Sequence, residues 1–564
     1  MNRFVAEFQD AHTSASLVAS TLPGRTEIAY LGFNGVRSGD ALEVTELLPT
    51  TSAASSFPIS VGDRVTKLDG VPLRDIVLDE MVKYRSLGYD EANLTYHMNG
   101  IFTRTPLVAA LPEKDNAVVT VERGGTESDI VLPWVVKDLQ TFIDDQTEAL
   151  NANVEATIAG IDAKQFLEAA AEIIESNDIG AFDVPIAGLP GHTWNYFKFV
   201  DNMPTLTSPS VVQKVRAHSL ASKGATASVE DIRAHLSSVR SIPSGAIILE
   251  ESATFPAYIA KVPTKEANQP PRFYGYMLLD TFSPPSEGQA LSEVSDLLAR
   301  FEDLGVEHLI IDTIDNGGGS LTFGLQLAKL LSRDPLDLPL IQFKTSETWI
   351  DQFETQSLSA PSDTEKELAR RVHEDLVAAR DAGDSISEPM PVDVLMPFQF
   401  LEGNADLPEL KVVVLTNEMC VSMCDIFAGV LKDNDLATII GKRTMGGGGN
   451  VVQHAQAPNS HLAVAQTESL ILRSNGTPIE NVGVKPDVEM EVHESAQSNY
   501  TPVRTKAVEL LNPCVGSSCV PADDLGAGKA QKSGGCSTTG GSSQRLFLLL
   551  IACAAVLVRR RRIS

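Results

Sequence analysis

The sequence predicts a multidomain protein of mixed α/β (α+β) class, with a small β domain, helical segments and a larger α/β core. Three observations lead to this prediction. The chain has 564 residues, which is more than one ordinary hydrophobic core accommodates. An apolar strand, a polar or glycine-rich turn and a helix follow one another twice in the second half of the chain. Short strands joined by an Asp-Gly turn lie in the first half.

Composition restricts the functions that this chain can have. Hydrophobic residues make up 43% and charged residues 21% of the chain, which is typical of folded globular domains. The formal net charge is −29. Binding to nucleic acid depends on clustered Lys and Arg that contact phosphates, so we expect no nucleic-acid partner.

The order of composition shifts divides the chain into six expected segments. These are a partial N-terminal segment (1–50), a small β domain (51–137), a helical linker region (138–240), an α/β core (241–495) with an acidic, partly helical insertion (345–408), a low-complexity linker (496–543), and an apolar terminal segment (544–564).

The small β domain resembles a PDZ domain. Residues 61–73 predict a strand, an Asp-Gly turn and a second strand, and residues 117–125 predict a final hairpin. A PDZ domain accepts an extended peptide as an added strand of its sheet. An ordinary small β domain remains the alternative, because residues 87–114 form a longer connection than a compact PDZ domain needs.

The core begins with apolar strands at residues 246–249 and 274–279. Residues 291–304 then place their apolar side chains on one helical face, and Gly305 suits the position just after a helix. A strand over residues 306–312, a glycine loop over 316–320 and a helix over 321–330 follow. The glycine loop has neither the lysine of a P-loop nor Rossmann spacing, so it is a weak nucleotide signal.

Ser422 lies where a second strand meets a helix. Apolar residues precede a polar turn at residues 415–420, and the spacing of Ile426, Phe427, Val430 and Leu431 predicts the helix. The first-turn N–H groups of a helix have no intrahelical partners and can bind a developing oxyanion. Two interpretations therefore stand: Ser422 is a nucleophile, or it only caps the helix.

The six cysteines are too few for a disulfide scaffold. We interpret Cys420 and Cys424 first as small apolar packing residues and second as reactive thiols. Cys514 and Cys519 lie in a segment rich in Pro, Gly and Ser, where a local disulfide would form outside the cytosol. A metal site is the rival for that pair, although no further ligands lie nearby.

The two ends of the chain carry different targeting signals. The first residues contain no apolar core of a secretory signal. The C-terminal part has an apolar run at 546–558 followed by four arginines, which indicates a membrane segment with a cytoplasmic end and an exported body. We therefore expect that the sequence lacks its true N-terminus.

Three stretches of the core resemble the C-terminal-processing (tail-specific) serine peptidase family. They are residues 309–322, 413–418 and 422–442. The resemblance covers about residues 240–495 and implies a ClpP/crotonase-like catalytic core, and the PDZ-like domain suits the same family. In the tail-specific branch the general base is a lysine, but its position in the matching turn is Gly447 here. A Ser/Lys dyad is therefore absent.

Two further motifs resemble the Ser-His-Glu branch of this family, which includes tricorn-type peptidases and the chlamydial protease-like activity factor. An Asp-x-His-Thr motif matches residues 10–13, and a Glu-Asn-x-Gly-Val-x-Pro-Asp motif matches residues 480–487. This resemblance implies that Ser422 is the nucleophile, that His12 is the general base and that Glu480 orients His12.

The chemistry of acyl transfer suits these residue types. Imidazole titrates near neutral pH and can take the proton of a serine hydroxyl, and a carboxylate can stabilise the resulting imidazolium. The resemblance implies Thr13 as a candidate relay between His12 and Glu480. For the oxyanion we expect the N–H groups of Met423 and Gly318 as donors. No metal and no organic cofactor is expected.

Other histidines are alternative bases, although none lies in a matching motif: His97, His192, His454 and His461. The C-terminal segment also resembles a myxobacterial C-terminal sorting tail, from Gly534-Gly535-Cys536-Ser537 through the apolar run to the arginines. That resemblance implies export, processing near Cys536 and anchoring at the cell surface, whereas a plain single-pass anchor is the alternative.

These observations predict an exported serine endopeptidase at the cell envelope or cell surface, with polypeptide substrates and a membrane contact through its C-terminal segment. Whether it forms a homo-oligomer stays open. The alternative from another class is a non-catalytic peptide-binding or scaffold protein of the same fold. A third hypothesis makes Cys420 or Cys424 the nucleophile.

Overall fold

The fold is described by a computed structural model of the chain. It describes residues 7–10, 13–17, 27–48, 57–104, 110–138, 141–142, 220, 223, 226–250, 252–262, 272–395, 410–453, 462–492 and 500–511. Most of the expected helical linker region (138–240) and the chain after residue 511 lie outside these ranges. So do the predicted base His12 and three of the alternative bases, His192, His454 and His461.

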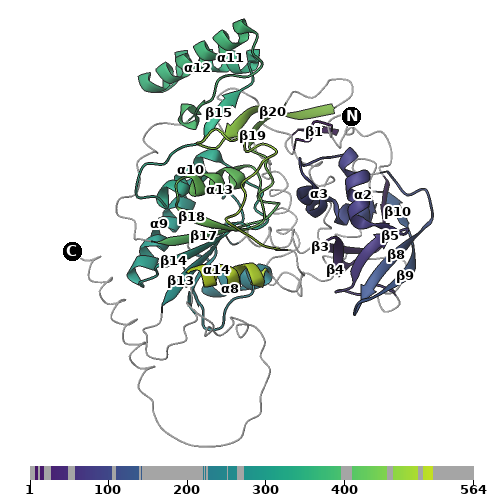
Figure 1. Cartoon of the computed structure of the whole chain (residues 1–564). Coiled ribbons are helices and arrows are strands. Elements are labelled where there is room, and N and C mark those ends of the chain that lie inside the picture. Colours follow the sequence, from purple (N-terminus) through teal and green to yellow (C-terminus); the bar gives the residue numbers. More distant parts are fainter. Residues whose placement is uncertain are drawn as a thin grey trace, which may run out of the picture. The chain divides into compact units, whose positions relative to one another are not determined.

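A seven-stranded sheet forms the centre of the core, in the order β11-β12-β13-β14-β17-β18-β21 (Figure 1). The strands are β11 (Ile247–Ile248), β12 (Ala257–Lys261), β13 (Phe273–Leu278), β14 (His308–Asp312), β17 (Lys411–Thr416), β18 (Ala437–Gly441) and β21 (Val488–Glu489). The pairs from β13 to β21 are parallel, and the two pairs before them are antiparallel. All residues of β14 are buried, as in a sheet covered on both faces.

Helices cover both faces of this sheet, which confirms the predicted α/β class. In Figure 1 one face carries α9 (Glu287–Asp303), α10 (Leu321–Leu330) and α13 (Met423–Asp433), and the other carries α8 (Val229–Val239) and α14 (Thr501–Leu511). Each layer has its own apolar cluster. Gly305 has a φ of 65° just after α9, as its predicted place after the helix requires.

Helix α14 corrects one expected boundary. The low-complexity linker was expected to begin at residue 496, but Val503, Ala507 and Leu511 are buried against the second face of the sheet. These residues repeat every four positions, so they lie on one side of the helix and bury an apolar stripe.

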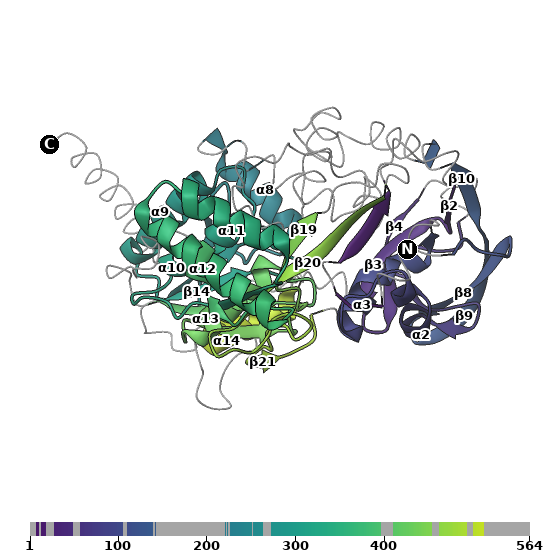
Figure 2. The same cartoon turned by 90° about the horizontal axis from the view of Figure 1, so that it is seen from above.

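A second sheet joins distant parts of the chain. Strand β20 (Leu462–Leu472) pairs antiparallel with β1 (Ser14–Leu17), β15 (Leu340–Phe343) and β19 (Gly449–Gln453), and β15 also pairs with β16 (Met390–Pro391). Figure 2 shows β1 beside β20. The N-terminal segment therefore contributes a strand to the core instead of standing apart from it.

The expected insertion contains two long helices, α11 (Glu347–Ser359) and α12 (Asp363–Ala382), and the 3-10 helix η6 (Val392–Leu395). The two α-helices lie side by side in Figures 1 and 2. Trp349 and Phe353 of α11 and Val372 of α12 join the apolar cluster of the core, so the insertion is anchored by burial of apolar surface.

The β domain has its own sheet and apolar cluster. Its strands are β3 (Phe33–Ser38), β4 (Ala41–Leu47), β5 (Arg64–Leu68), β6 (Val71–Pro72), β8 (Asn116–Arg123) and β9 (Thr126–Pro133), and its helices are α2 (Leu73–Asp79), α3 (Asp90–His97), η3 (Met81–Lys83) and η4 (Asn99–Ile101). A small sheet of β10 (Val135–Asp138), β2 (Glu27–Tyr30) and β7 (Thr103–Arg104) adjoins them in sequence. Asp69 and Gly70 form the predicted turn, with φ values of 51° and 80°.

The β domain begins earlier than the expected boundary at residue 51. Strand β4 pairs with β5, and β3 pairs with β4, so residues 33–47 belong to the same sheet as the later strands. Sequence alone did not show that residues 33–47 pair with the later strands, because strand pairing joins residues far apart in the chain.

Candidate active site

Ser422 occupies a sharp turn between β17 and α13. Its backbone has a φ of 61° and a ψ of −123°, while an ordinary N-cap residue lies in the β region. A residue other than glycine in such a conformation costs about 1–3 kcal/mol and is found mostly at functional sites. Only 4% of Ser422 is exposed. These features favour a functional serine over a simple helix cap.

The carboxylate of Asp425 holds this turn from inside the protein. It accepts hydrogen bonds from the N–H groups of Ser422 at 2.9 Å, Gly446 at 2.9 Å and Gly447 at 3.0 Å. Burial raises the pKa of Asp425 to about 6, although these bonds oppose the shift. Asp425 therefore connects the backbone of Ser422 to the glycine turn at residues 446–449.

The first glycine loop packs directly on Ser422. A Cβ atom added to Gly318 would lie 2.7 Å from the Cβ of Ser422 and 3.0 Å from the backbone nitrogen of Met423. Gly318 has a φ of 91°, and Val421 N–H donates to the carbonyl of Asn316 at 3.2 Å. Only a glycine suits this approach of two backbones.

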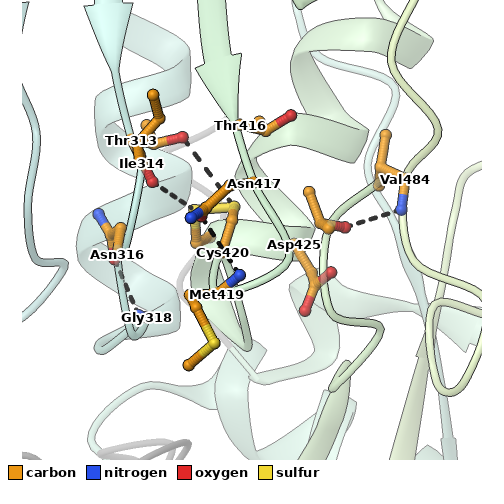
Figure 3. The surroundings of a disulfide bond; sticks show 12 residues. Thr313, Ile314, Asn316, Gly318, Thr416, Asn417, Met419, Cys420, Asp425 and Val484 are labelled. Carbon is orange, nitrogen blue, oxygen red and sulfur yellow. Dashed lines mark hydrogen bonds between the residues drawn. A yellow bond between two sulfur atoms is a disulfide. The ribbon is translucent and has the colours of Figure 1, made fainter. Parts of the chain in front are cut away.

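The two expected oxyanion donors differ in their hydrogen bonding. Met423 is the first residue of α13, a position whose N–H has no acceptor within the helix. The Gly318 N–H, in contrast, donates to the side-chain oxygen of Asn316 at 2.8 Å, as the dashed line in Figure 3 shows. The Gly318 N–H therefore already has a hydrogen-bond acceptor in this structure.

The two bulky neighbours of Ser422, Val421 and Met423, are buried in two different apolar clusters. Val421 packs with Leu87 and Ala92 of the β domain. The side chain of Met423 packs against Gly324 of α10, where an added Cβ would lie 2.5 Å from it. These side chains fill space on either side of the turn.

Cys420 and Cys424 are joined by a disulfide bond, with their Cα atoms 5.2 Å apart (Figure 3). Both residues pack in the apolar cluster of the core, as first interpreted. The interpretation as reactive thiols and the hypothesis of a cysteine nucleophile are wrong, because the two sulfur atoms are bonded to each other. Spacing of four places both residues on one side of a helical turn, but only the folded turn brings their sulfur atoms within bonding reach.

Glu480 lies across the glycine turn from Asp425. One carboxylate oxygen of Glu480 accepts the N–H of Gly449 at 2.9 Å, and the other has no hydrogen-bond partner among the described residues. Burial, together with the smaller effects of the Asp10 and Asp425 carboxylates, raises the pKa of Glu480 to about 9. Glu480 therefore carries a proton at neutral pH in this arrangement.

The residues on either side of His12 lie in the same region. Thr13 donates its hydroxyl to Asp10 at 2.6 Å and accepts the N–H of Thr467 on β20 at 3.3 Å. Asp10 is close enough to shift the pKa of Glu480. His12 itself lies outside the described residues, so its distance from Ser422 stays a prediction.

Of the alternative bases, His97 lies among the described residues. It is buried in α3, and its Nε2 hydrogen-bonds to the carbonyl of Arg85 at 2.8 Å. Burial lowers the pKa of His97 to about 4, so it stays neutral near pH 7. This histidine has a structural role in the β domain.

The sequence and fold of this chain are similar to those of known proteins. Residues 274–490 match peptidase family S41, and residues 20–87 match the PDZ domain. Over residues 274–490 the core is therefore similar to peptidases of family S41. The described site, with Ser422, the glycine loop and Glu480, lies within the matched segment.

Several known proteins are similar in sequence to part of this chain, and the match covers only part of each protein. A protein of Chlamydia trachomatis serovar D is 30% identical over 278 residues, which are 44% of this chain and 45% of that protein. Carboxyl-terminal-processing peptidase 3 of Arabidopsis thaliana is 27% identical over 215 residues, 38% of this chain and 31% of that one. The chain thus spans less than half the length of these relatives.

A solved structure shares the fold over most of the chain. Mature CPAF matches with a TM-score of 0.57 and 19% sequence identity, covering 92% of this chain and 88% of that one. A complex of mature CPAF with lactacystin matches with a TM-score of 0.55 and 20% identity, covering 90% and 86%. These likenesses show the fold of the S41 core and its accompanying domains.

Two polar residues whose hydrogen bonds hold the segments around Ser422 were not identified from the sequence. One is Asp425. A serine followed three positions later by an acidic residue often marks the start of a helix, and this pattern at Ser422 could have identified Asp425. The other is Asn417, whose side chain accepts the Asp315 N–H at 3.0 Å and donates to the Asp315 carboxylate at 2.7 Å. Asn417 thereby joins the end of β17 to the loop after β14.

Proposed function

We propose that this protein is an exported serine endopeptidase in which Ser422, His12 and Glu480 hydrolyse peptide bonds. The observation that carries the proposal is the conformation of Ser422. It lies in a positive-φ turn at the start of α13, directly under the glycine loop of an S41 core. A strained, buried serine beside helical N–H groups is suited to nucleophilic attack on a carbonyl carbon.

In the proposed reaction the Ser422 hydroxyl attacks the scissile carbonyl and forms an acyl-enzyme, which water then hydrolyses. The N–H of Met423 is the first oxyanion donor. Gly318 becomes the second donor only if its N–H exchanges the side chain of Asn316 for the oxyanion. The close approach of Gly318 to Met423 supports this pair.

His12 takes the proton of Ser422 in this proposal and returns it to the leaving amine. Near the segment that contains His12, the carboxylates of Asp10 and Asp425 raise the pKa of Glu480. A positive charge beside Glu480 would lower its pKa, and the imidazolium of His12 is the cation that the mechanism generates. Thr13, bound to Asp10, is the candidate relay.

Polypeptides are the proposed substrates, because an S41 core and a PDZ domain occur in one chain. The β domain also contacts the Ser422 turn: Arg37 forms an ion pair with Glu418 at 3.1 Å, and Val421 packs with Leu87. A peptide added to the β domain would thus be held by a part of the protein that touches the catalytic turn.

Export and attachment to the membrane or cell surface are part of the same proposal. The Cys420–Cys424 disulfide supports an oxidising compartment. Among the described residues, no helix is long and apolar enough to cross a membrane, and the proposed anchor at 544–564 lies outside them. Fractionation of cells that produce the full chain tests this point: we expect the protein with the envelope, and recovery in the cytosol would contradict it.

A fluorophosphonate probe tests the catalytic proposal, because it reacts with activated serines. We expect the full chain to be labelled at Ser422, and both Ser422→Ala and His12→Ala to lose labelling. The control is Ser286→Ala, which removes an ordinary N-cap bond to Gln289 in α9 and should label normally. Absence of labelling in the unmodified, folded protein would instead favour a non-catalytic peptide-binding protein.

A further inference from the structure

The disulfide bond encloses Ser422 in a small covalent ring. Cys420 lies two residues before Ser422 and Cys424 two residues after it, within the first turn of α13. Both cysteines are buried, at 0% and 1% exposure. The bond therefore acts on the part of the backbone that has the unusual positive φ of Ser422.

The contacts of the ring extend to both glycine segments of the site. The carbonyl of Cys420 accepts the N–H of Met445, which leads into the glycine turn, at 2.8 Å. The Sγ of Cys420 lies 4.0 Å from the hydroxyl of Thr313, and the Sγ of Cys424 lies 3.9 Å from the Thr313 carbonyl oxygen. Thr313 directly follows β14, on the segment that leads to the Gly318 loop (Figure 3).

The short loop indicates what the bond contributes. A disulfide stabilises a fold mainly by restricting the unfolded chain, and this effect grows with the number of residues enclosed. Cys420 and Cys424 are only four positions apart, so the effect on the unfolded chain is small. The local constraint on the folded turn is the larger consequence, because a displacement of about 1 Å at a reacting group can cost on the order of 100-fold in rate.

We propose that the Cys420–Cys424 disulfide is a positioning element that holds Ser422 in its reactive conformation, so that reduction of the bond lowers the reactivity of Ser422. This inference rests on the proposed function of Ser422. A dithiol reduces the bond by two exchange steps: the S–S bond breaks, two protons pass from the dithiol to the cysteine sulfurs, and the dithiol becomes a cyclic disulfide.

The experiment compares Ser422 reactivity in the oxidised, reduced and re-oxidised full chain. Thiols are counted by alkylation after denaturation and mass spectrometry, because both sulfurs are buried in the native protein. The readouts are the second-order rate constant of fluorophosphonate labelling, and kcat and KM with a peptide substrate. Circular dichroism shows whether the reduced protein is still folded.

We expect reduced, folded protein to label at least about tenfold more slowly, with a fall in kcat and little change in KM, and to recover on re-oxidation. The double variant Cys420→Ala/Cys424→Ala should label as slowly as the reduced protein and should not respond to the dithiol. The matched control, Cys514→Ala/Cys519→Ala, should respond like the unmodified chain.

Three results would overturn the inference. One is alkylation of Cys420 and Cys424 without prior reduction, which shows that the bond is absent. Another is a double variant that labels as fast as the unmodified chain, which leaves the proposed peptidase intact. A third is unfolding of both the reduced protein and the double variant, which would show that the bond stabilises the whole fold and does not only position Ser422. If the folded, oxidised chain is never labelled, the result contradicts the proposed function of Ser422 and therefore also this inference.

Discussion

At the scale of single residues, the surroundings of Glu480 change the pKa of its carboxyl group strongly. Burial and the neighbouring carboxylates raise its pKa to about 9 from its ordinary value of 4.5. The folded state therefore binds this proton more tightly than the unfolded chain does. The stability from the protonated carboxyl is complete below the unfolded pKa and is lost as the pH rises toward the folded pKa.

This shift predicts how Glu480→Gln changes the pH dependence of stability. The amide cannot ionise, so the variant should lose less stability than the unmodified chain between about pH 6 and about pH 9. Thermal unfolding at both pH values measures the difference. As a control, Glu354→Gln on the exposed side of α11 should follow the unmodified chain. Equal losses in all three proteins would contradict the prediction.

At the scale of elements, the glycine loop after β14 limits the space beside Ser422. In Gly318→Ala the new Cβ would lie 2.6 Å from the carbonyl oxygen of Val421 and 2.7 Å from the Cβ of Ser422. Such contacts force the loop or the turn to move, so we expect fluorophosphonate labelling to fall by at least about tenfold. The rate constant of labelling is the measurement.

Gly317 provides a matched control in the same loop. A Cβ at this position would meet no atom within 4 Å, and Gly317 does not have a positive φ. Gly317→Ala should therefore label at nearly the rate of the unmodified chain. If both variants lost labelling equally, general loosening of the loop would explain the loss better than the close approach of Gly318 to Ser422.

Strand β1 brings the motif around His12 to the core. Thr13 bonds to Asp10 and to Thr467 of β20 just before β1 begins. Thr13→Val removes both bonds but keeps the shape of the side chain, so we expect slower labelling of Ser422, whereas Thr13→Ser should keep most of it. Labelling rates of the two variants test this prediction, and indistinguishable rates would show that the hydroxyl is unimportant.

At the scale of the whole molecule, a buried ion pair connects the β domain to the catalytic turn. The side chains of Arg37 and Glu418 are 5% and 1% exposed. Arg37→Met removes the ion pair of the buried Glu418 carboxylate, so it should reduce the free energy of unfolding by about 3–5 kcal/mol. Urea unfolding measures this loss.

The exposed pair of Lys67 and Glu127 provides the comparison for that prediction. Their side chains are 36% and 45% exposed, so Lys67→Met should change the free energy of unfolding by at most about 1 kcal/mol. A loss of similar size in both variants would show that the contact between Arg37 and Glu418 is not specially buried in solution.

The patterns that predicted the fold were those with strong local periodicity. The helix over residues 321–330 and the strand before Ser422 were placed correctly, because apolar spacing and glycine positions record local structure. The start of the β domain was placed too late, since β3 and β4 show their membership only through pairing with β5.

By itself, the sequence determined the α/β class, the place of Ser422 at a strand-to-helix junction and the motifs around His12 and Glu480. Only the tertiary structure decided that Cys420 and Cys424 form a disulfide, that Asp425 holds the Ser422 turn and that Glu480 is protonated near neutral pH. The physical reason is the distance along the chain between the interacting residues. Helix and strand preferences act between near neighbours, whereas bond formation, burial and pKa shifts depend on groups that only the complete fold brings together.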